Sequence, residues 1–283
     1  MKYQEYLPHS SLRDYVKCFW ILEHEYTLDK NKENVIPDAC IELIFNFGAP
    51  YVFKPEGLPD REMPKAFLVG LQKKPLLFTC DGTVRIVATR FFSRGALPFI
   101  SKHAHTPNSL SMNPGDDWRL LASKLEPQVL SDDYDGAVAR VEDFLISRIL
   151  AEAIDLKSIQ IAARLLYQKK GQFRVAELAD YCNLSTRQLE RRFQDATGVS
   201  PKAVARAIRF DEIRARLMFE PDSNLTDLAY EFGYTDQAHF IRDFKEFADK
   251  TPGEFASEMR GLQSVFHDHE NVVFLQLSSP ASE

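Results

Sequence analysis

The sequence lacks the features that mark membrane, secreted and disulfide-linked proteins. No apolar run reaches the roughly 18 residues that cross a bilayer, and the start MKYQEYLPHSS has no basic segment followed by an apolar stretch. The four cysteines, Cys18, Cys40, Cys80 and Cys182, form no CxxC pair and have no metal-ligand spacing. We therefore expect a cytosolic protein that contacts no membrane and keeps its thiols reduced.

The sequence also lacks catalytic signatures. It contains no GxSxG, HExxH, GxxxxGKS/T or GxGxxG. His103 and His105 lie in SKHAHTP without a matching carboxylate, so we expect two loop histidines rather than a metal site. Cys40 in PDAC could be an alkyl acceptor, but it lies in an apolar run without companion cysteines. We expect no cofactor and no enzyme; the alternative is an enzyme or repair-type domain fused to a DNA-targeting module.

An excess of positive charge is missing as well. The formal net charge is −6, which argues against a generally basic coat that binds nucleic acid nonspecifically. Any DNA-binding role must therefore depend on local features. The length of 283 residues, with 45% hydrophobic and 27% charged residues, is enough for two modest cores. We expect two domains.

The first part of the chain has the pattern of a β domain. Short apolar runs are separated by Pro, Gly and Asp, as expected of strands; they span residues 18–25, 39–48, 66–71, 76–80 and 84–92. Asp81-Gly82 has the composition of a hairpin turn before the last run. Glu42 lies within an apolar run, so its carboxylate must point outward, be paired, or face a ligand cavity. A barrel-like sheet is expected.

The pattern becomes helical after about residue 115. Val138, Val141, Leu145 and Ile149 form one stripe at helical spacing, and no convincing strand follows before residue 262. The predicted class is α+β, with a β-rich barrel-like domain followed by an all-α domain. We expect these parts to be a sensor-type domain, a helical connector, a DNA-binding domain and a tail, at residues 1–110, 111–155, 156–262 and 263–283.

The helical part contains an internal repeat. LADYCNLSTRQLERRFQDATGVSP begins at Leu178 and LAYEFGYTDQAHFIRDFKEFADKTP begins at Leu228, with one residue inserted in the second turn. Each copy is predicted to form a helix, a short turn and a second helix, capped by Ser185 in the first copy and by Thr235 or Asp236 in the second. The sequence thus predicts two helix-turn-helix motifs.

The second helix of each copy has an outward face suited to DNA. Apolar residues such as Phe193 and Phe244 form its buried stripe, and the opposite face mixes amide, methyl, branched apolar and guanidinium groups, which suit base edges and phosphates. The two faces match position by position. The candidate DNA-binding residues are Thr186, Arg187, Glu190, Arg191 and Gln194 in the first copy, and Gln237, Ala238, Ile241, Arg242 and Lys245 in the second. A packed helical hairpin with a solvated face is the simpler alternative.

The region from about 156 to 262 resembles the DNA-binding domain of the AraC/XylS family of bacterial transcription regulators. The second copy matches the family pattern at Leu228-Ala229, Gly233-Tyr234, Asp236-Gln237, His239-Phe240, Arg242, Phe244-Lys245 and Pro252. It departs from the pattern at Asp249, where glycine is usual, and at Phe255-Ala256, where Tyr-Arg is usual. These departures bear on local turn geometry.

The resemblance implies a function and partners. It implies a cytoplasmic regulator, an activator in keeping with the family or else a repressor, that binds double-stranded DNA through two recognition helices, held about 34 Å apart by the long helix in PKAVARAIRFDEIRARLMFE. It further implies contact with RNA polymerase, a small-molecule effector in the first domain and a homodimer, with the effector's identity open. Residues 157–218 carry net positive charge and residues 219–262 net negative charge, so we expect the first motif to supply most of the phosphate attraction.

Overall fold

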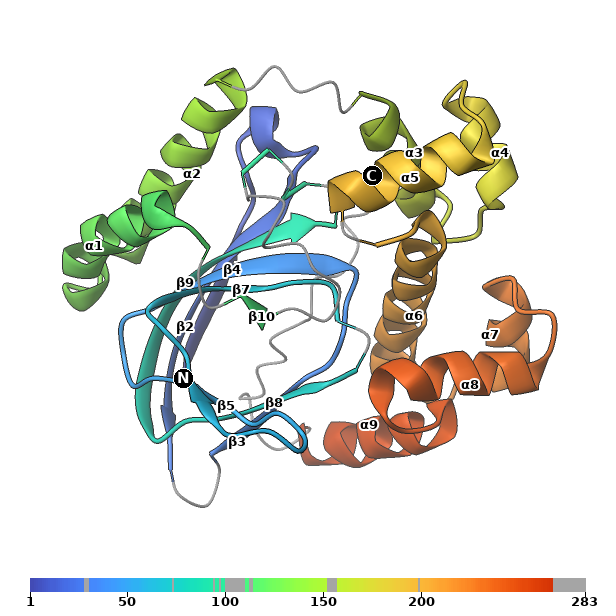
Figure 1. The fold of residues 1–283 in the computed structure, drawn as a ribbon. Coiled ribbons are helices and arrows are strands. Elements are labelled where there is room, and N and C mark those ends of the chain that lie inside the picture. The colour runs from blue at the N-terminus through green and yellow to red at the C-terminus, as the bar shows by residue number, and fades with distance from the viewer. Residues whose placement is uncertain are drawn as a thin grey trace.

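The computed structural model describes residues 1–27, 31–72, 74–93, 95–96, 98–99, 110–111, 114–151, 157–197 and 199–266. These residues form a β-rich first half and a helical second half, which confirms the predicted α+β class (Figure 1). His103 and His105, and the rest of the C-terminal tail beyond residue 266, lie outside the described residues.

The strands of the first half form two sheets. The strands are β1 (Lys2–Tyr6), β2 (Val16–Tyr26), β3 (Lys32–Val35), β4 (Cys40–Asn46), β5 (Val52–Phe53), β6 (Arg61–Glu62), β7 (Ala66–Val69), β8 (Leu76–Thr79), β9 (Gly82–Phe92) and β10 (Leu110–Ser111). The larger sheet has the order β1-β2-β9-β4-β7-β10, and the smaller has the order β3-β8-β5-β6. Within the described residues the two sheets are separate, so the barrel-like domain is an open arrangement rather than a closed barrel.

All five predicted strand runs are strands, but the predicted hairpin at Asp81-Gly82 is wrong. β8 pairs with β3 and β5, whereas β9 pairs with β2 and β4. The turn therefore leads the chain from the smaller sheet to the larger one. Gly82 has φ +109°, a conformation that side chains rarely permit, and this allows the abrupt change of direction. Turn composition predicts where a chain bends, but not which strands then pair.

The larger sheet is buried on both faces. On β2, Phe19 and Ile21 belong to the core shared with the helices, whereas Trp20 and Leu22 belong to a second core that faces the smaller sheet. Successive side chains of a strand point to opposite faces, so an uninterrupted apolar run is what a strand buried on both faces requires.

Two helices cover one face of the larger sheet. They are α1 (Asp116–Leu130) and α2 (Tyr134–Ala151), which lie beside β9 and β7 (Figure 1). The Trp118 ring on α1 contacts Phe45 on β4, with 6.5 Å between ring centroids. Val138, Val141 and Leu145 are buried and Ile149 is half-buried against the same core, which confirms the predicted stripe of α2. The segment expected to be a connector thus packs as part of the β half.

The second half consists of helices around a long central one. They are α3 (Lys157–Gln168), α4 (Val175–Tyr181), α5 (Thr186–Thr197), α6 (Pro201–Phe219), α7 (Leu225–Glu231), α8 (Gln237–Ala248) and α9 (Pro252–Phe266). The Ser200 side chain caps α6 by accepting from the Ala203 N–H, and Pro201 occupies the first turn. Figure 1 shows α6 between the α4–α5 pair and the α7–α8 pair. Within the described residues, no helix is long and apolar enough to cross a membrane.

Hydrogen bonds and ion pairs join the two halves. The Tyr167 hydroxyl on α3 donates to the Ala39 carbonyl at 2.5 Å and accepts from the Ser93 N–H at 3.1 Å. Arg164 on the same helix pairs with Asp14 at 2.8 Å. The helical half is therefore fixed to the β half through the C-terminal part of its first helix.

Candidate nucleic-acid interface and internal cavity

The first predicted helix-turn-helix is formed by α4 and α5. Asn183 in the turn has φ +53°, and the Leu184 N–H donates to the Ala179 carbonyl at 3.0 Å. The Ser185 hydroxyl accepts from the Gln188 N–H at 3.3 Å, while the Gln188 side chain accepts from the Ser185 N–H at 2.9 Å. This reciprocal pair is a capping box and confirms Ser185 as the predicted cap of the helix.

The second motif, formed by α7 and α8, repeats this geometry. Gly233 takes the left-handed position with φ +74°, and the Tyr234 N–H donates to the Ala229 carbonyl at 2.9 Å. Asp236 caps α8 by accepting from the His239 N–H at 2.7 Å, and this hydrogen bond lowers the pKa of the Asp236 carboxyl. Both predicted copies therefore share one turn conformation and one turn hydrogen bond, fifty positions apart.

The structure places the predicted DNA-binding residues on the outer faces of α5 and α8. Nine of the ten side chains are exposed, and Ile241 is half-buried. Among the described residues, Arg187, Arg191 and Arg242 have no ion-pair partner. On the opposite faces Phe193 and Phe244 are fully buried, as the stripe predicted. Three guanidinium groups are thus available on the face that the repeat pattern indicates.

An ion pair that the sequence did not predict holds α8 against α6. Arg206 on α6 donates from Nε to the Asp243 carboxylate at 2.8 Å, and its Nη2 lies 2.6 Å from Glu246. The Tyr234 hydroxyl donates to the other oxygen of Asp243 at 3.0 Å. Asp243 is buried, so its charge faces α6 rather than solvent. Phe210 on α6 adds a stacked contact with Phe247 at 4.9 Å.

Both departures from the family pattern have a place in the structure. Asp249 has φ +57° and ends α8 in the left-handed conformation, in which Asp is tolerated better than most residues with side chains. Phe255 and Ala256 are buried, and the Phe255 ring lies 5.6 Å from that of Phe244. These residues thus extend the core behind the recognition helix.

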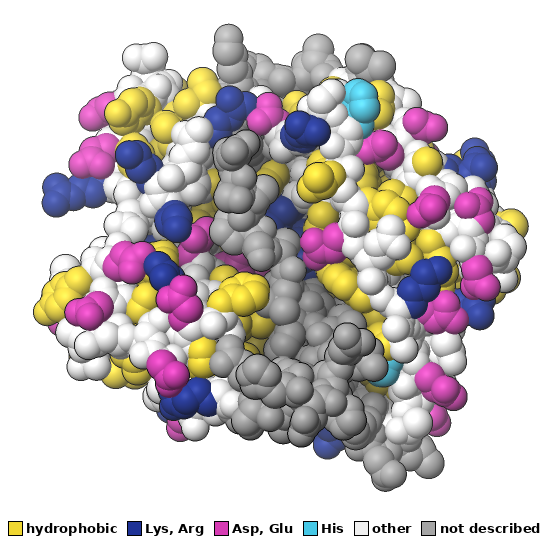
Figure 2. Space-filling view, turned by 180° about the vertical axis from the view of Figure 1, so that it is seen from behind, with side chains coloured by type: hydrophobic (Ala, Val, Ile, Leu, Met, Phe, Trp, Pro, Cys, Tyr) yellow, Lys and Arg dark blue, Asp and Glu magenta, His cyan; other side chains and the backbone are white. Residues whose placement is uncertain are grey.

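Charge is mixed over the face of the molecule seen from behind. Figure 2 shows Lys and Arg side chains interspersed with Asp and Glu there, so neither sign dominates that face. With the net charge of −6, this means that any attraction for a polyanion must come from local groups of positive charge. The described residues contain no group of three or more His, Cys, Asp or Glu side chains placed to hold a metal ion.

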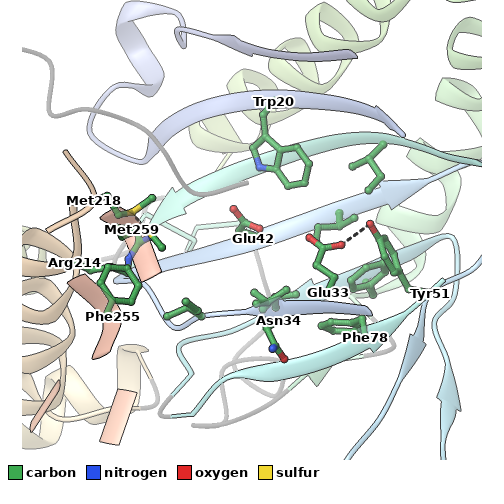
Figure 3. A pocket seen from close by; sticks show the side chains of 16 residues that line it. Trp20, Glu33, Asn34, Glu42, Tyr51, Phe78, Arg214, Met218, Phe255 and Met259 are labelled. Atoms are coloured by element: carbon green, nitrogen blue, oxygen red, sulfur yellow. Dashed lines mark hydrogen bonds between the residues drawn. The ribbon is translucent and has the colours of Figure 1, made fainter. Parts of the chain in front are cut away.

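The structure also contains a partly open cavity of about 240 Å³ between the sheets. Trp20 and Phe67 line it from the larger sheet, and Glu33 and Phe78 from the smaller one, as Figure 3 shows in part. Four more lining residues come from the helical half: Arg214, Met218, Phe255 and Met259. The cavity therefore touches both halves of the chain.

Glu42, whose carboxylate was expected to point outward, be paired or face a cavity, is both paired and part of the cavity lining. It accepts from Arg90 Nε at 2.6 Å, and these two residues are partners in the register of β4 and β9. Arg90 is fully buried and was not identified from sequence. The signal that could have identified it is a second charged residue of opposite sign within an apolar strand run.

Two known protein families match two separate parts of the chain. A family described as "Helix-turn-helix domain" matches residues 178–258, and a family described as "Domain of unknown function" matches residues 4–111. The helix-turn-helix match covers both motifs, and the other match covers the two sheets.

Curated relatives match only part of the chain. The chain is 32% identical to the transcriptional activator RhaS of Yersinia pestis over 83 residues, covering 29% of this chain and 30% of that protein. It is 26% identical to the transcriptional regulator MtrA of Neisseria gonorrhoeae over 117 residues, covering 41% and 38%. An uncharacterized regulator of Staphylococcus aureus strain MSSA476 is 26% identical over 108 residues, 36% of this chain and 14% of that protein. The chain thus spans about a seventh to two fifths of these relatives' lengths.

Two solved structures are also similar to this chain. ToxT from Vibrio cholerae matches with a TM-score of 0.47 and 13% identity, covering 86% of this chain and 98% of that one. A regulator with an AraC-type DNA-binding domain from Chromobacterium violaceum matches with a TM-score of 0.34 and 21% identity, covering 38% and 96%.

Proposed function

We propose that this chain, whose residues 178–258 are a helix-turn-helix domain of the AraC type, is a sequence-specific transcription regulator that reads two successive major-groove segments. The observation that carries the proposal is the repeated geometry of the two motifs. Each ends its turn with the same hydrogen bond and presents at least one arginine on the outer face of its second helix, with no ion-pair partner in the described part of the chain. A helix inserted in the major groove reads bases with such a face.

Arg187, Arg191, Gln237 and Arg242 are proposed to contact base edges or phosphates, with the other exposed residues of the two faces around them. RNA polymerase is proposed as a protein partner, a second copy of the chain as an oligomeric partner, and a small molecule as the effector. The proposed domain boundaries lie at residues 110, 155 and 262. Between the first two, α1 and α2 pack on the larger sheet, and α9 continues past the third to Phe266.

A regulator is favoured over a repair-type enzyme by the environment of Cys40. The thiol is buried, and burial raises its pKa well above the ordinary value of a cysteine. An alkyl acceptor must be a thiolate within reach of its substrate, because the thiolate is the nucleophile. Cys40 meets neither condition, so its role is that of a small apolar residue in the core of the larger sheet.

The experiment that tests this function is selection of bound sequences from a random DNA library by the purified protein. We expect enrichment of a site with two recognition elements about one helical turn apart, protected together in a footprint. A variant with Arg187→Ala and Arg242→Ala is the matched comparison, because both side chains are exposed and their removal leaves the core unchanged. Failure of the wild-type protein to enrich any sequence would contradict the proposal.

A further inference from the structure

The cavity between the sheets has one charged lining residue whose charge is not balanced by an ion pair. Three charged side chains line the cavity. Glu42 pairs with Arg90 at 2.6 Å, and Arg214 pairs with Asp211 at 2.6 Å. Glu33 has no ion-pair partner among the residues that the structure describes. A carboxylate enclosed by apolar groups is costly unless a cation or several hydrogen bonds accompany it.

Two tyrosines hold the Glu33 carboxylate without filling its bonding capacity. The Tyr26 hydroxyl donates to Oε2 at 2.5 Å and the Tyr51 hydroxyl donates to the same oxygen at 3.0 Å. Oε1 has no hydrogen-bond partner in the described part of the chain. Figure 3 shows one oxygen of Glu33 turned toward Tyr51 and the other toward the interior, on the side of Glu42. Two hydrogen bonds therefore fix one oxygen of the carboxylate, and the other oxygen faces the cavity, where a ligand could reach it.

Aromatic rings surround the space in front of Glu33. Trp20, Tyr51, Phe67 and Phe78 all line the cavity, and the ring centroids of Tyr51 and Phe78 are 5.8 Å apart. Faces of aromatic rings attract cations, and their apolar area favours a hydrophobic body. Together with a carboxylate, such walls suit an organic cation better than a sugar, which needs many polar partners, or an anion.

The single cation of the lining, Arg214, lies at the other end of the cavity. Figure 3 shows it beside Met218 and Phe255, at the edge where the helical half begins, away from Glu33. Its pairing with Asp211 at 2.6 Å reduces its attraction for an anionic ligand. The electrostatic contrast along the cavity therefore places a ligand's positive group near Glu33 and its apolar part toward the methionines Met218 and Met259.

We propose that this cavity binds a small organic cation, an ammonium or guanidinium group on an aromatic or branched apolar body, with Glu33 as its counter-ion. The proposal deepens the effector role proposed above and rests on it for any consequence at DNA. A volume of about 240 Å³ accommodates a ligand of one ring with a short side chain. The ligand would contact α6 and α9, so that binding would favour the observed seating of the helical half on the sheets.

The protonation behaviour of Glu33 agrees with this role. Burial raises the pKa of its carboxyl, and the hydrogen bonds from Tyr26 and Tyr51 offset only part of that rise. A bound cation would favour the carboxylate, so ligand affinity should increase as the pH rises through this raised pKa and then level off. The other titratable and charged groups around the cavity that could contribute are Tyr26, Tyr51, Cys80, Glu42 and Arg214.

The test compares matched ligands that differ only in their polar group. Calorimetry on the full-length protein without DNA would use a panel of triplets, such as 2-phenylethylamine, 2-phenylethanol and phenylacetate. We expect amines of this size to bind with saturation, at least about tenfold tighter than the alcohols, and the carboxylates to bind least. An equal or higher affinity for the alcohols or carboxylates would overturn the proposed ligand class. No binding by any amine of the panel would overturn the site.

Variants locate the binding and control for folding. Glu33→Gln keeps an acceptor for both tyrosines and should lose the preference for amines over alcohols. Glu25→Gln, at an exposed position on β2, is the control and should bind like wild type. Retention of the full amine preference by Glu33→Gln would refute the counter-ion role. Because the wild-type ligand series needs no variant, the proposal can be decided even if Glu33→Gln does not fold.

The two proposals fail separately. If DNA selection yields no site but the amines bind, the regulator function is wrong and the cation site stands. If a DNA site is found and no amine binds, the function stands and the ligand class is wrong. When both succeed, DNA affinity is measured with and without a saturating amine. A difference would show that ligand binding in the cavity changes DNA binding.

Discussion

Arg206 on α6 and Asp243 on α8 form an ion pair across the interface between these two helices, with 2.8 Å between Nε and Oδ1. The two residues are 37 positions apart, and Asp243 lies on the buried face of its helix. Its carboxylate therefore adds no charge to the outer face of α8, and its role is to fix the orientation of α8 on α6.

Removal of the buried partner should cost more stability than removal of the exposed one. Asp243→Ala leaves the Tyr234 hydroxyl and one edge of Arg206 without their acceptor, so we expect a loss of about 1–3 kcal/mol in the free energy of unfolding. Glu246→Ala, which removes the exposed partner of the same guanidinium, should cost under about 1 kcal/mol. Urea denaturation of both variants measures this, and equal losses would show that burial of Asp243 is unimportant.

Single alanine substitutions on the recognition faces should change sequence preference rather than folding. For Arg187, Arg191, Gln237 or Arg242, loss of a base-reading side chain should weaken binding to the selected site by about 1–3 kcal/mol and relax preference at one base step. All four are exposed, so their thermal unfolding should match wild type. If all four variants bind the site like wild type, the assignment of these faces is wrong.

The salt dependence of binding should differ between the two half-sites. Lys169, Arg174 and Lys202 are exposed around the first motif, whereas Arg206 is engaged by two carboxylates. Each lost phosphate contact reduces the slope of log K against log salt by about 0.9. Scrambling the half-site of the first motif should therefore flatten the slope more than scrambling that of the second. Comparable flattening by either change would contradict this division.

Stability without ligand should depend on the protonation of Glu33. The folded-state pKa lies above the unfolded value because of burial, so the stability contribution of the protonated acid is lost as pH rises through the folded pKa. Glu33→Gln cannot lose that proton, and we expect it to be more stable than wild type above this range and similar below it. Melting temperatures across pH 4 to 8 decide the question, with Glu25→Gln as the reference. Parallel curves for wild type and Glu33→Gln would count against the idea.

Local sequence patterns predicted where the strands and helices lie better than they predicted which of these elements pack or pair with one another. The apolar runs identified the main strands, and the repeat located both motifs, including the cap at Ser185. Each of these depends on residues close together in the chain. The Asp81-Gly82 turn was also located correctly, but its strands join different sheets, because pairing is decided by packing over long range.

The charged residues of the cavity were also predicted only in part from the sequence. Glu42 could be singled out because a carboxylate in an apolar strand needs an explanation, and it proved to pair with Arg90. Glu33 could not, because its significance depends on Tyr26 and Tyr51, which approach it only in the folded chain. The pairing of Arg206 with Asp243 likewise requires two helices to meet. Sequence patterns indicate single residues that need partners, and the three-dimensional arrangement supplies those partners.

The anchoring of α3 has a consequence for anyone who would separate the two halves. Tyr167 bonds to a carbonyl and an amide of the sheet, and its ring lies 5.1 Å from that of Phe92. A fragment that begins near residue 157 would expose this ring and leave its hydroxyl without either partner. The same cut would open the wall of the cavity and uncover Met218 and Met259. Such a fragment would expose apolar side chains to solvent, so a cut near the expected boundary at residue 155 removes contacts on which the helical half depends.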